Sequence, residues 1–120
     1  MSLEYFLSEK EGLVVIAFKG SLGEDCGPEL LRCLQACLAK LPRGIVIHMA
    51  EIGPVPRERL RDFGSFLRDL RVNGTPFRLS GLEQKARADL VQAGLADRSE
   101  VKGTLEEAAK DVWLRVKAAA

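Results

Sequence analysis

The stretch RGIVIHMAEIGPVPRERLRDFGSFLRDLRVNG, residues 43–74, decides the fold of this chain. It begins with a run from Gly44 to Met49 that is apolar on both faces. Such a run is typical of a central strand in a sheet that is covered on both sides. The segment Ala50–Pro56 is interrupted by glycine and proline, so it predicts a loop at the carboxyl end of that strand. In open α/β sheets this edge is where ligands and partners usually bind.

The second half of the stretch predicts a helix. Pro56 suits an early helical position, and apolar residues then recur at spacings of three, four and three. Asn73 and Gly74 together are a strong stop signal. The apolar residues of this helix are Leu60, Phe63, Leu67 and Leu70.

The flanking segments extend this pattern in both directions. Leu3–Leu7 and Leu13–Phe18 flank a polar turn and predict an opening hairpin. An amphipathic helix over Pro28–Leu41 would link the hairpin to the central strand by a parallel crossover. Downstream we expect a strand over Thr75–Ser80, a helix over Glu83–Ala93, a short edge strand within Arg98–Val101 and a last helix over Leu105–Val116.

The resulting element order is β-β-α-β-α-β-α-(β)-α. It predicts an α/β fold with one mixed sheet of four to five strands and about four helices. No repeat or linker divides the chain, so we expect a single domain over residues 1–120.

Composition argues against several classes of function. The net charge of +1 provides no broad positive field for nucleic acid. The N-terminus lacks the pattern of a signal peptide, and the longest apolar run, Leu13–Phe18, is too short to span a bilayer. We therefore expect a cytoplasmic protein that binds neither nucleic acid nor membranes.

The three cysteines, Cys26, Cys33 and Cys37, are an odd number and do not suggest a disulfide framework. Cys33 and Cys37 lie one helical turn apart and could share a metal ion, but His48 is the only histidine. We expect the thiols to act as small buried apolar groups, with no metal and no cofactor.

Several short segments, taken in order, resemble the STAS domain, the fold of bacterial anti-sigma factor antagonists and of the cytoplasmic tails of sulfate transporters. Members of that family often open the first crossover with Gly-x-Leu-Asp, and Gly20–Gly23 reads Gly-Ser-Leu-Gly here. Gly74 before Phe77–Leu79 and the run Thr104–Ala108 resemble the closing half of the family. The resemblance covers about Leu13 to Val116 and implies the same fold.

The resemblance also implies where a phosphorylation switch would lie. The family motif Asp-Ser-Ser-Gly-Leu falls on Pro56–Leu60, where only the leucine is kept, and the family phosphoserine corresponds to Glu58. Glu58 has no hydroxyl to phosphorylate, so the usual switch is absent. Glu58 either imitates the phosphorylated serine in its charge or serves as a first-turn residue paired with Arg61.

Arginines crowd the helix after the loop, interleaved with acidic residues. Because both signs are present, the usual explanation is a solvated outer face. The alternative is that Arg57 and Arg59 make charge-assisted contacts with an acidic partner. The residues of both signs are Arg57, Glu58, Arg59, Arg61, Asp62, Arg68, Asp69 and Arg71.

The resemblance to the STAS family implies a non-enzymatic regulatory module that binds a protein, such as an anti-sigma factor or a kinase-like regulator, in signalling and transcription control. The expected partner-binding residues are Pro56, Arg57, Glu58, Arg59 and Asp62, with Glu24 and Asp25 in a neighbouring loop. Two alternatives stay open. One is a scaffold or self-associating subunit, such as a homodimer, in a signalling assembly. The other is a small-molecule sensor that uses His48, for which the sequence offers no evident nucleophile nearby.

Overall fold

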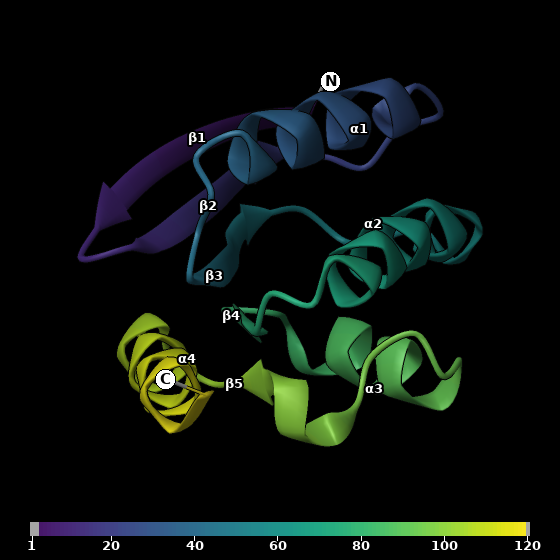
Figure 1. Ribbon diagram of the computed structural model, residues 1–120. Coiled ribbons are helices and arrows are strands. Elements are labelled where there is room, and N and C mark those ends of the chain that lie inside the picture. The colour runs from purple at the N-terminus through teal and green to yellow at the C-terminus, as the bar shows by residue number, and fades with distance from the viewer. Residues whose placement is uncertain (1–2, 120) are drawn as a thin grey trace.

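One five-stranded sheet runs through the molecule in the order β1-β2-β3-β4-β5 (Figure 1). In this computed structural model, residues 3–119 are described. Strand β1 is antiparallel to β2, and each later pair is parallel. The strands are β1 Leu3–Lys10, β2 Leu13–Gly20, β3 Gly44–Ile52, β4 Phe77–Ser80 and β5 Val101–Lys102. The helices are α1 Cys26–Leu38, α2 Leu60–Asn73, α3 Gln84–Gln92 and α4 Leu105–Ala119, with 3-10 turns η1 Arg57–Arg59 and η2 Arg98–Glu100.

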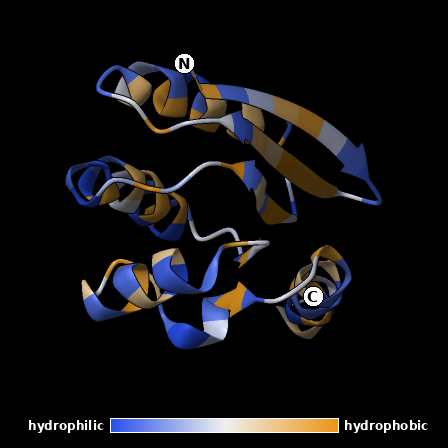
Figure 2. Cartoon of the chain, turned by 180° about the vertical axis from the view of Figure 1, so that it is seen from behind, coloured by the Kyte–Doolittle hydropathy of each residue, from blue (hydrophilic) through white to orange (hydrophobic). Residues whose placement is uncertain are grey.

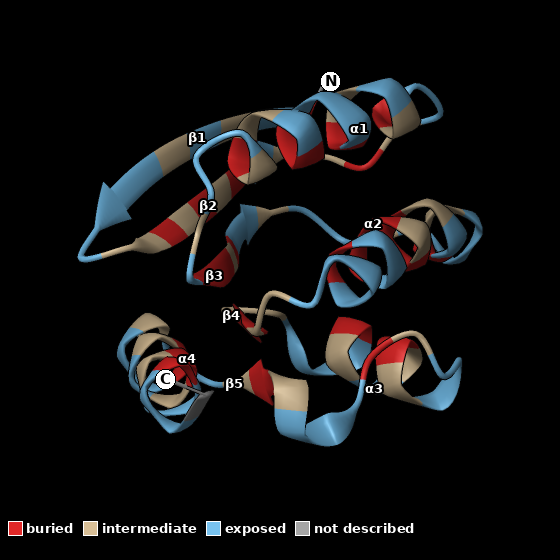
Figure 3. Cartoon of the chain, viewed as in Figure 1, coloured by how far each residue is buried: buried red, intermediate tan, exposed pale blue. Residues whose placement is uncertain are grey.

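This order confirms the predicted α/β fold with a mixed sheet and four helices. Helices α1, α2 and α3 lie on one side of the sheet and α4 on the other (Figure 1). The buried residues of α1 and α2 are on the sides that face the sheet (Figure 3). Strands at the centre of the molecule are mostly apolar when seen from behind (Figure 2).

Among residues 3–119, none of the helices combines the length and the apolar character that a membrane span requires.

Strand β3 is central, as predicted, and its residues from Gly44 to Ile47 are buried. The strand nevertheless continues to Ile52, beyond the predicted end at Met49. Pairing with β2 resumes after an irregularity between Ala17 and Lys19, which carries the ladder to the end of both strands. The predicted loop Ala50–Pro56 is therefore shorter and begins after Ile52.

The first hairpin is tighter than predicted. The strands β1 and β2 pair all the way to Lys10 and Leu13, which leaves only Glu11 and Gly12 as the turn. Both turn residues have positive φ, at 54° and 83°. Two-residue hairpin turns of this kind match the twist of the strands they join.

Helix α1 begins earlier and ends earlier than Pro28–Leu41. It starts at Cys26, so Pro28 lies within the first turn, where a missing N–H costs nothing. Leu41, the last residue of the predicted helix, lies outside α1, is 86% exposed and has φ 53°. Pro42 follows it and disfavours helical backbone at the preceding residue.

The apolar stripe of α2 is buried as predicted. Phe63 and Phe66 pack with Phe18 of β2 at ring-centroid distances of 6.5 and 5.8 Å. The start of the helix differs, because Pro56 precedes the 3-10 turn η1 and α2 begins only at Leu60. Gly74 ends it with φ 83°, the left-handed conformation that favours glycine after a helix.

The edge strand near Arg98 was placed too early. Asp97 and Glu100 form a capping box, which holds Arg98–Glu100 in the 3-10 turn η2. Strand β5 is therefore only Val101–Lys102. On helix α3, Ala86 and Leu90 are buried, whereas Ala93, which follows the helix, is exposed.

Helix α4 covers the second face of the sheet. Its residues Ala108, Val112 and Val116 pack against Val46 of β3, as the apolar spacing predicted. Arg78 of β4 is 5% exposed and forms an ion pair with Asp111 of α4. Partial burial by itself raises the pKa of Asp111. The hydrogen bond from Arg78 and the positive charges of Arg78, Lys102 and Arg115 have a larger, opposite effect, so the pKa of Asp111 is lowered overall.

Candidate functional site

Two loops meet at the carboxyl edge of β2 and β3. The N–H of Gly53 donates to the carbonyl oxygen of Gly20 at 3.0 Å, which joins the start of the β3–α2 loop to the end of β2, where the β2–α1 loop begins. Since β2 and β3 are parallel, their carboxyl ends lie at the same edge. Glu24 and Asp25 are exposed in the β2–α1 loop.

The turn η1 presents two charged side chains to solvent. Pro56 precedes it in an extended conformation and accepts a hydrogen bond from the N–H of Arg59 at 2.9 Å. Arg57 and Glu58 are exposed. Among the described residues, Glu58 forms no ion pair, so the contact with Arg61 considered above is not formed. The carboxylate of Glu58 nevertheless lies at the positive end of a helical segment.

Asp62 links the start of α2 to the start of α1. Arg59 lies 3.5 Å from its carboxylate, and the thiol of Cys26 donates to the same group at 3.8 Å. Burial raises the pKa of Cys26, and the charge of Asp62 raises it further. Asp62 thus lies beside the loop that carries Asp25. Arg59 is held by its ion pair with Asp62, whereas Arg57 forms no ion pair with any described residue.

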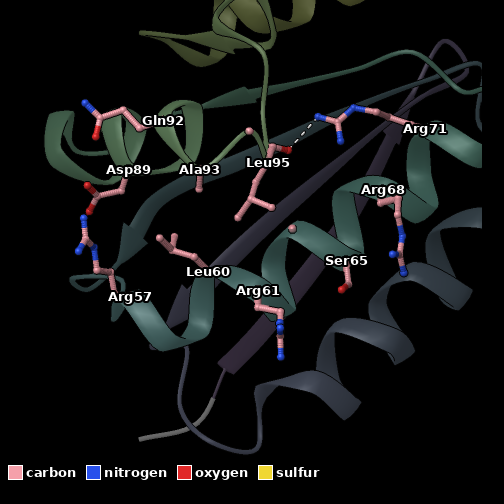
Figure 4. Close-up of a pocket in the computed structure, with 12 residues that line it drawn as sticks. Arg57, Leu60, Arg61, Ser65, Arg68, Arg71, Asp89, Gln92, Ala93 and Leu95 are labelled. Atoms are coloured by element: carbon pink, nitrogen blue, oxygen red, sulfur yellow. Dashed lines mark hydrogen bonds between the residues drawn. The ribbon is translucent and has the colours of Figure 1, made fainter.

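A groove of about 920 Å³ lies between α2 and α3 (Figure 4). It is called the arginine groove below. Arg57 points toward Asp89 across it, and Leu60 and Leu95 point toward one another at its floor (Figure 4). The lining residues are Arg57, Leu60, Arg61, Gly64, Ser65, Arg68, Arg71, Asp89, Gln92, Ala93, Gly94 and Leu95.

Arg71 closes one end of the arginine groove and is firmly held. It donates to Glu100 at 2.6 Å and to the carbonyl oxygen of Leu95 at 3.0 Å. Its guanidinium also lies 5.4 Å from the ring centroid of Phe77. Arg57 and Arg61 make no hydrogen bond or ion pair within residues 3–118 and remain available. The sequence pattern singled out Arg57 for binding, whereas Arg61 was considered as a partner of Glu58 and, with Arg68, as part of a solvated face.

The opposite flank of α2 carries a smaller groove of about 130 Å³, called the leucine groove below. It lies between α1 and α2 and combines apolar side chains with two carboxylates. Its residues are Gly27, Leu30, Leu31, Leu34, Asp62, Ser65, Phe66 and Asp69.

His48 lies in β3, opposite Ser80 of β4, and the two side chains are hydrogen bonded at 2.9 Å. No nucleophile near His48 was evident from the sequence, because the register between the two strands is not visible there. Ser80 is fully buried, so its hydroxyl cannot reach a substrate in this conformation. The pair is suited to holding the two strands in register.

The cysteines are all free and buried, in keeping with the apolar role predicted for them. Burial raises the pKa of Cys33 to about 12 and that of Cys37 to about 11. Both thiols therefore stay protonated at neutral pH, which disfavours metal binding. No group of three or more His, Cys, Asp or Glu side chains suited to a metal occurs within the described part of the chain.

Comparison with known proteins found similarity in solved structures. No family model matches the chain, and no curated protein matches it. An anti-sigma factor antagonist from Mycobacterium paratuberculosis superposes with a TM-score of 0.76 at 20% identity, covering 92% of this chain and 94% of that one. A sulfate transporter family protein from Wolinella succinogenes gives a TM-score of 0.76 at 16% identity, covering 92% of each chain.

A third similar chain belongs to a structure of the stressosome, described as a signal integration and transduction hub. Its TM-score is 0.70 at 17% identity, covering 91% of this chain and 96% of that one. These likenesses confirm the fold that the sequence predicted, which is that of a STAS domain.

Proposed function

Because the chain has the STAS fold, we propose that it is a non-enzymatic regulatory module that docks a protein partner, in the manner of an anti-sigma factor antagonist. The observation that carries this proposal is the exposed turn η1, at the loop edge of the sheet, where the guanidinium of Arg57 forms no ion pair or hydrogen bond with any other described residue. Pro54 and Pro56 restrict the backbone there and so lower the entropy cost of ordering the loop on binding.

The proposed docking surface extends from η1 to the loop beside it. It comprises Pro56, Arg57, Glu58, Arg59 and Asp62, with Glu24 and Asp25. Support comes from the Gly53–Gly20 hydrogen bond, which joins the β3–α2 loop to the end of β2, and from the Cys26–Asp62 contact, which joins the starts of α1 and α2. We place the module in the cytoplasm of a bacterium, acting in a signalling pathway that controls transcription through an anti-sigma factor or kinase-like partner.

In this proposal the phosphorylation switch is absent at η1. Glu58 carries a fixed charge at the position that the STAS resemblance assigns to a phosphoserine. A carboxylate has one negative charge, whereas a phosphoserine has nearly two and more acceptor oxygens, so the imitation is partial.

Capture from the native cell tests the docking surface. We expect wild-type protein to retain a regulator with a kinase-like domain, and the Arg57→Ala/Arg59→Ala pair to lose it. Arg32→Ala/Lys40→Ala is the matched control, because both residues are exposed on or just after α1 and the charge change is the same. If the first pair retains every partner that wild type retains, the surface is wrong.

Intact mass tests the missing switch. With ATP and the captured kinase, wild type should keep its mass, while Glu58→Ser should gain about 80 Da, the mass of one phosphoryl group. Stable phosphorylation of wild type would show that another hydroxyl serves as the acceptor.

A second candidate function is a scaffold or self-associating subunit of a signalling assembly. The likeness to a chain of the stressosome favours it. Light scattering coupled to size exclusion separates the two, because the scaffold predicts a dimer or larger species for the isolated chain.

A further inference from the structure

The geometry points to the arginine groove as the binding site for an acidic segment of the protein partner. This inference rests on the proposed function and deepens it, because it assigns a second surface and the charge of the partner's contact. Three observations support it: the excess of unpaired positive charge, the spacing of the arginines, and the apolar character of the groove floor.

Positive charge outweighs negative charge along the groove. Four arginines and one aspartate line it. Arg71 is already bound to Glu100 and Leu95, but Arg57 and Arg61 have no such partner in the described residues. The side chain of Arg68 is 71% exposed, and within residues 3–119 its one ion pair is a 4.0 Å contact with Asp69. Three guanidinium groups are therefore available for carboxylates, which they bind well as planar forks.

The spacing of these groups selects an extended ligand. Arg57 and Arg68 are eleven positions apart on one helical segment, which corresponds to about 17 Å along its axis. A single phosphate or carboxylate cannot contact both ends. An extended peptide of about five residues covers that length and places acidic side chains at intervals along it.

The rest of the lining favours protein over nucleic acid. Leu60, Ala93 and Leu95 provide an apolar floor, and a Cβ at Gly64 would lie 2.6 Å from Leu95 Cδ2, so the two walls are in close contact there. No aromatic side chain is among the lining residues, whereas proteins that bind single-stranded nucleic acid commonly stack bases on aromatic rings. The ligand that fits is an acidic segment with one apolar anchor.

Binding of a synthetic peptide tests this assignment without the natural partner. The probe has about eight residues, rich in aspartate and glutamate around one leucine, and its binding is followed by fluorescence anisotropy and by NMR of the labelled protein. We expect shifts confined to η1, α2, α3 and residues 93–95, and about tenfold weaker binding for Arg57→Ala/Arg61→Ala/Arg68→Ala. Raising the salt concentration should weaken binding to wild type.

The matched control is Arg32→Ala/Lys40→Ala/Lys110→Ala, which removes the same charge from exposed positions outside the groove. An equal loss in this control would overturn the proposal, because it would show attraction to net charge alone. Absence of binding to wild type at low salt, or tighter binding of an oligothymidylate than of the peptide, would also overturn it.

The two proposals can fail separately. The captured partner is tested against Arg61→Glu/Arg68→Glu, which leaves η1 intact. Loss of that partner supports the arginine groove. Retention of the partner by this variant, together with loss in Arg57→Ala/Arg59→Ala, would overturn the groove assignment while leaving the docking module in place.

Discussion

The two grooves that flank α2 are opposite in charge and unequal in size. The arginine groove measures about 920 Å³ and has four arginines and one aspartate in its lining, whereas the leucine groove measures about 130 Å³ and includes Asp62 and Asp69. One helix supplies both charged walls. In an α-helix, Arg61 and Arg68 lie within about 20° of each other, as do Asp62 and Asp69, and the two pairs are about 100° apart. Charges that are interleaved in the sequence are thus separated in space.

Removing the inner anchor of α2 should have the largest effect, because it disturbs both grooves. Phe63 is 1% exposed and stacks on Phe66 at 5.9 Å. We expect Phe63→Ala to lower the free energy of unfolding by about 3 to 5 kcal/mol. Urea unfolding measures the change. Val72→Ala on the same helix is the control, since Val72 is 82% exposed and should cost little.

The ion pair between Arg78 and Asp111, on the other face of the sheet, should contribute less to stability than Phe63 does. Its loss should leave both grooves unchanged. Asp111→Ala leaves the buried guanidinium of Arg78 without its carboxylate and should cost about 2 kcal/mol. Glu106→Ala on the exposed side of α4 is the control. A shift of groove resonances in Asp111→Ala would contradict this separation.

The same pair predicts a dependence of stability on pH. The pKa of Asp111 is lowered in the folded protein. Its stabilising contribution is therefore present above the unfolded value, near 3.9, and is lost as pH falls through the lowered folded value. Wild type should lose stability more steeply than Asp111→Asn over this acidic window in thermal unfolding. Parallel curves for the two proteins would disprove the assignment.

Arg71 should contribute more to the stability of the fold than the other arginines of the arginine groove do. Its bonds to Glu100 and Leu95 tie α2 to the segment after α3. We expect Arg71→Ala to cost about 1 kcal/mol, since the pair is partly exposed. A double-mutant cycle with Glu100→Ala measures the coupling.

Arg61→Ala should change the unfolding free energy by less than about 0.5 kcal/mol, the smallest effect expected here. The structure gives it no internal partner, so its role would lie in binding. A cost equal to that of Arg71→Ala would show that the two arginines serve the same structural purpose.

The apolar pattern predicted most of the fold, because burial leaves a periodic record in the sequence. The inner faces of α2 and α4 and the central place of β3 followed from it. Element ends were harder to predict. The extension of β3 to Ile52 depends on pairing with β2, and the displacement of β5 depends on the capping box between Asp97 and Glu100.

The proposed site was predictable only in part, for a related reason. The exposed turn with Arg57 and Glu58 follows from the loop and the helix start. The arginine groove does not, because alternating signs around α2 resemble an ordinary solvated face until α1 and α3 are placed on either side. The contact of His48 with Ser80 likewise depends on the register between two strands.

The unequal borders of the sheet have a consequence for aggregation. At one border, β5 is only two residues long and offers little backbone for another strand to join. At the other, β1 is eight residues long but carries the charges of Glu4, Glu9 and Lys10. Charged side chains on an open strand discourage the addition of further strands. Both borders thus disfavour growth of the sheet from molecule to molecule, so self-association of this chain should proceed through side-chain surfaces instead.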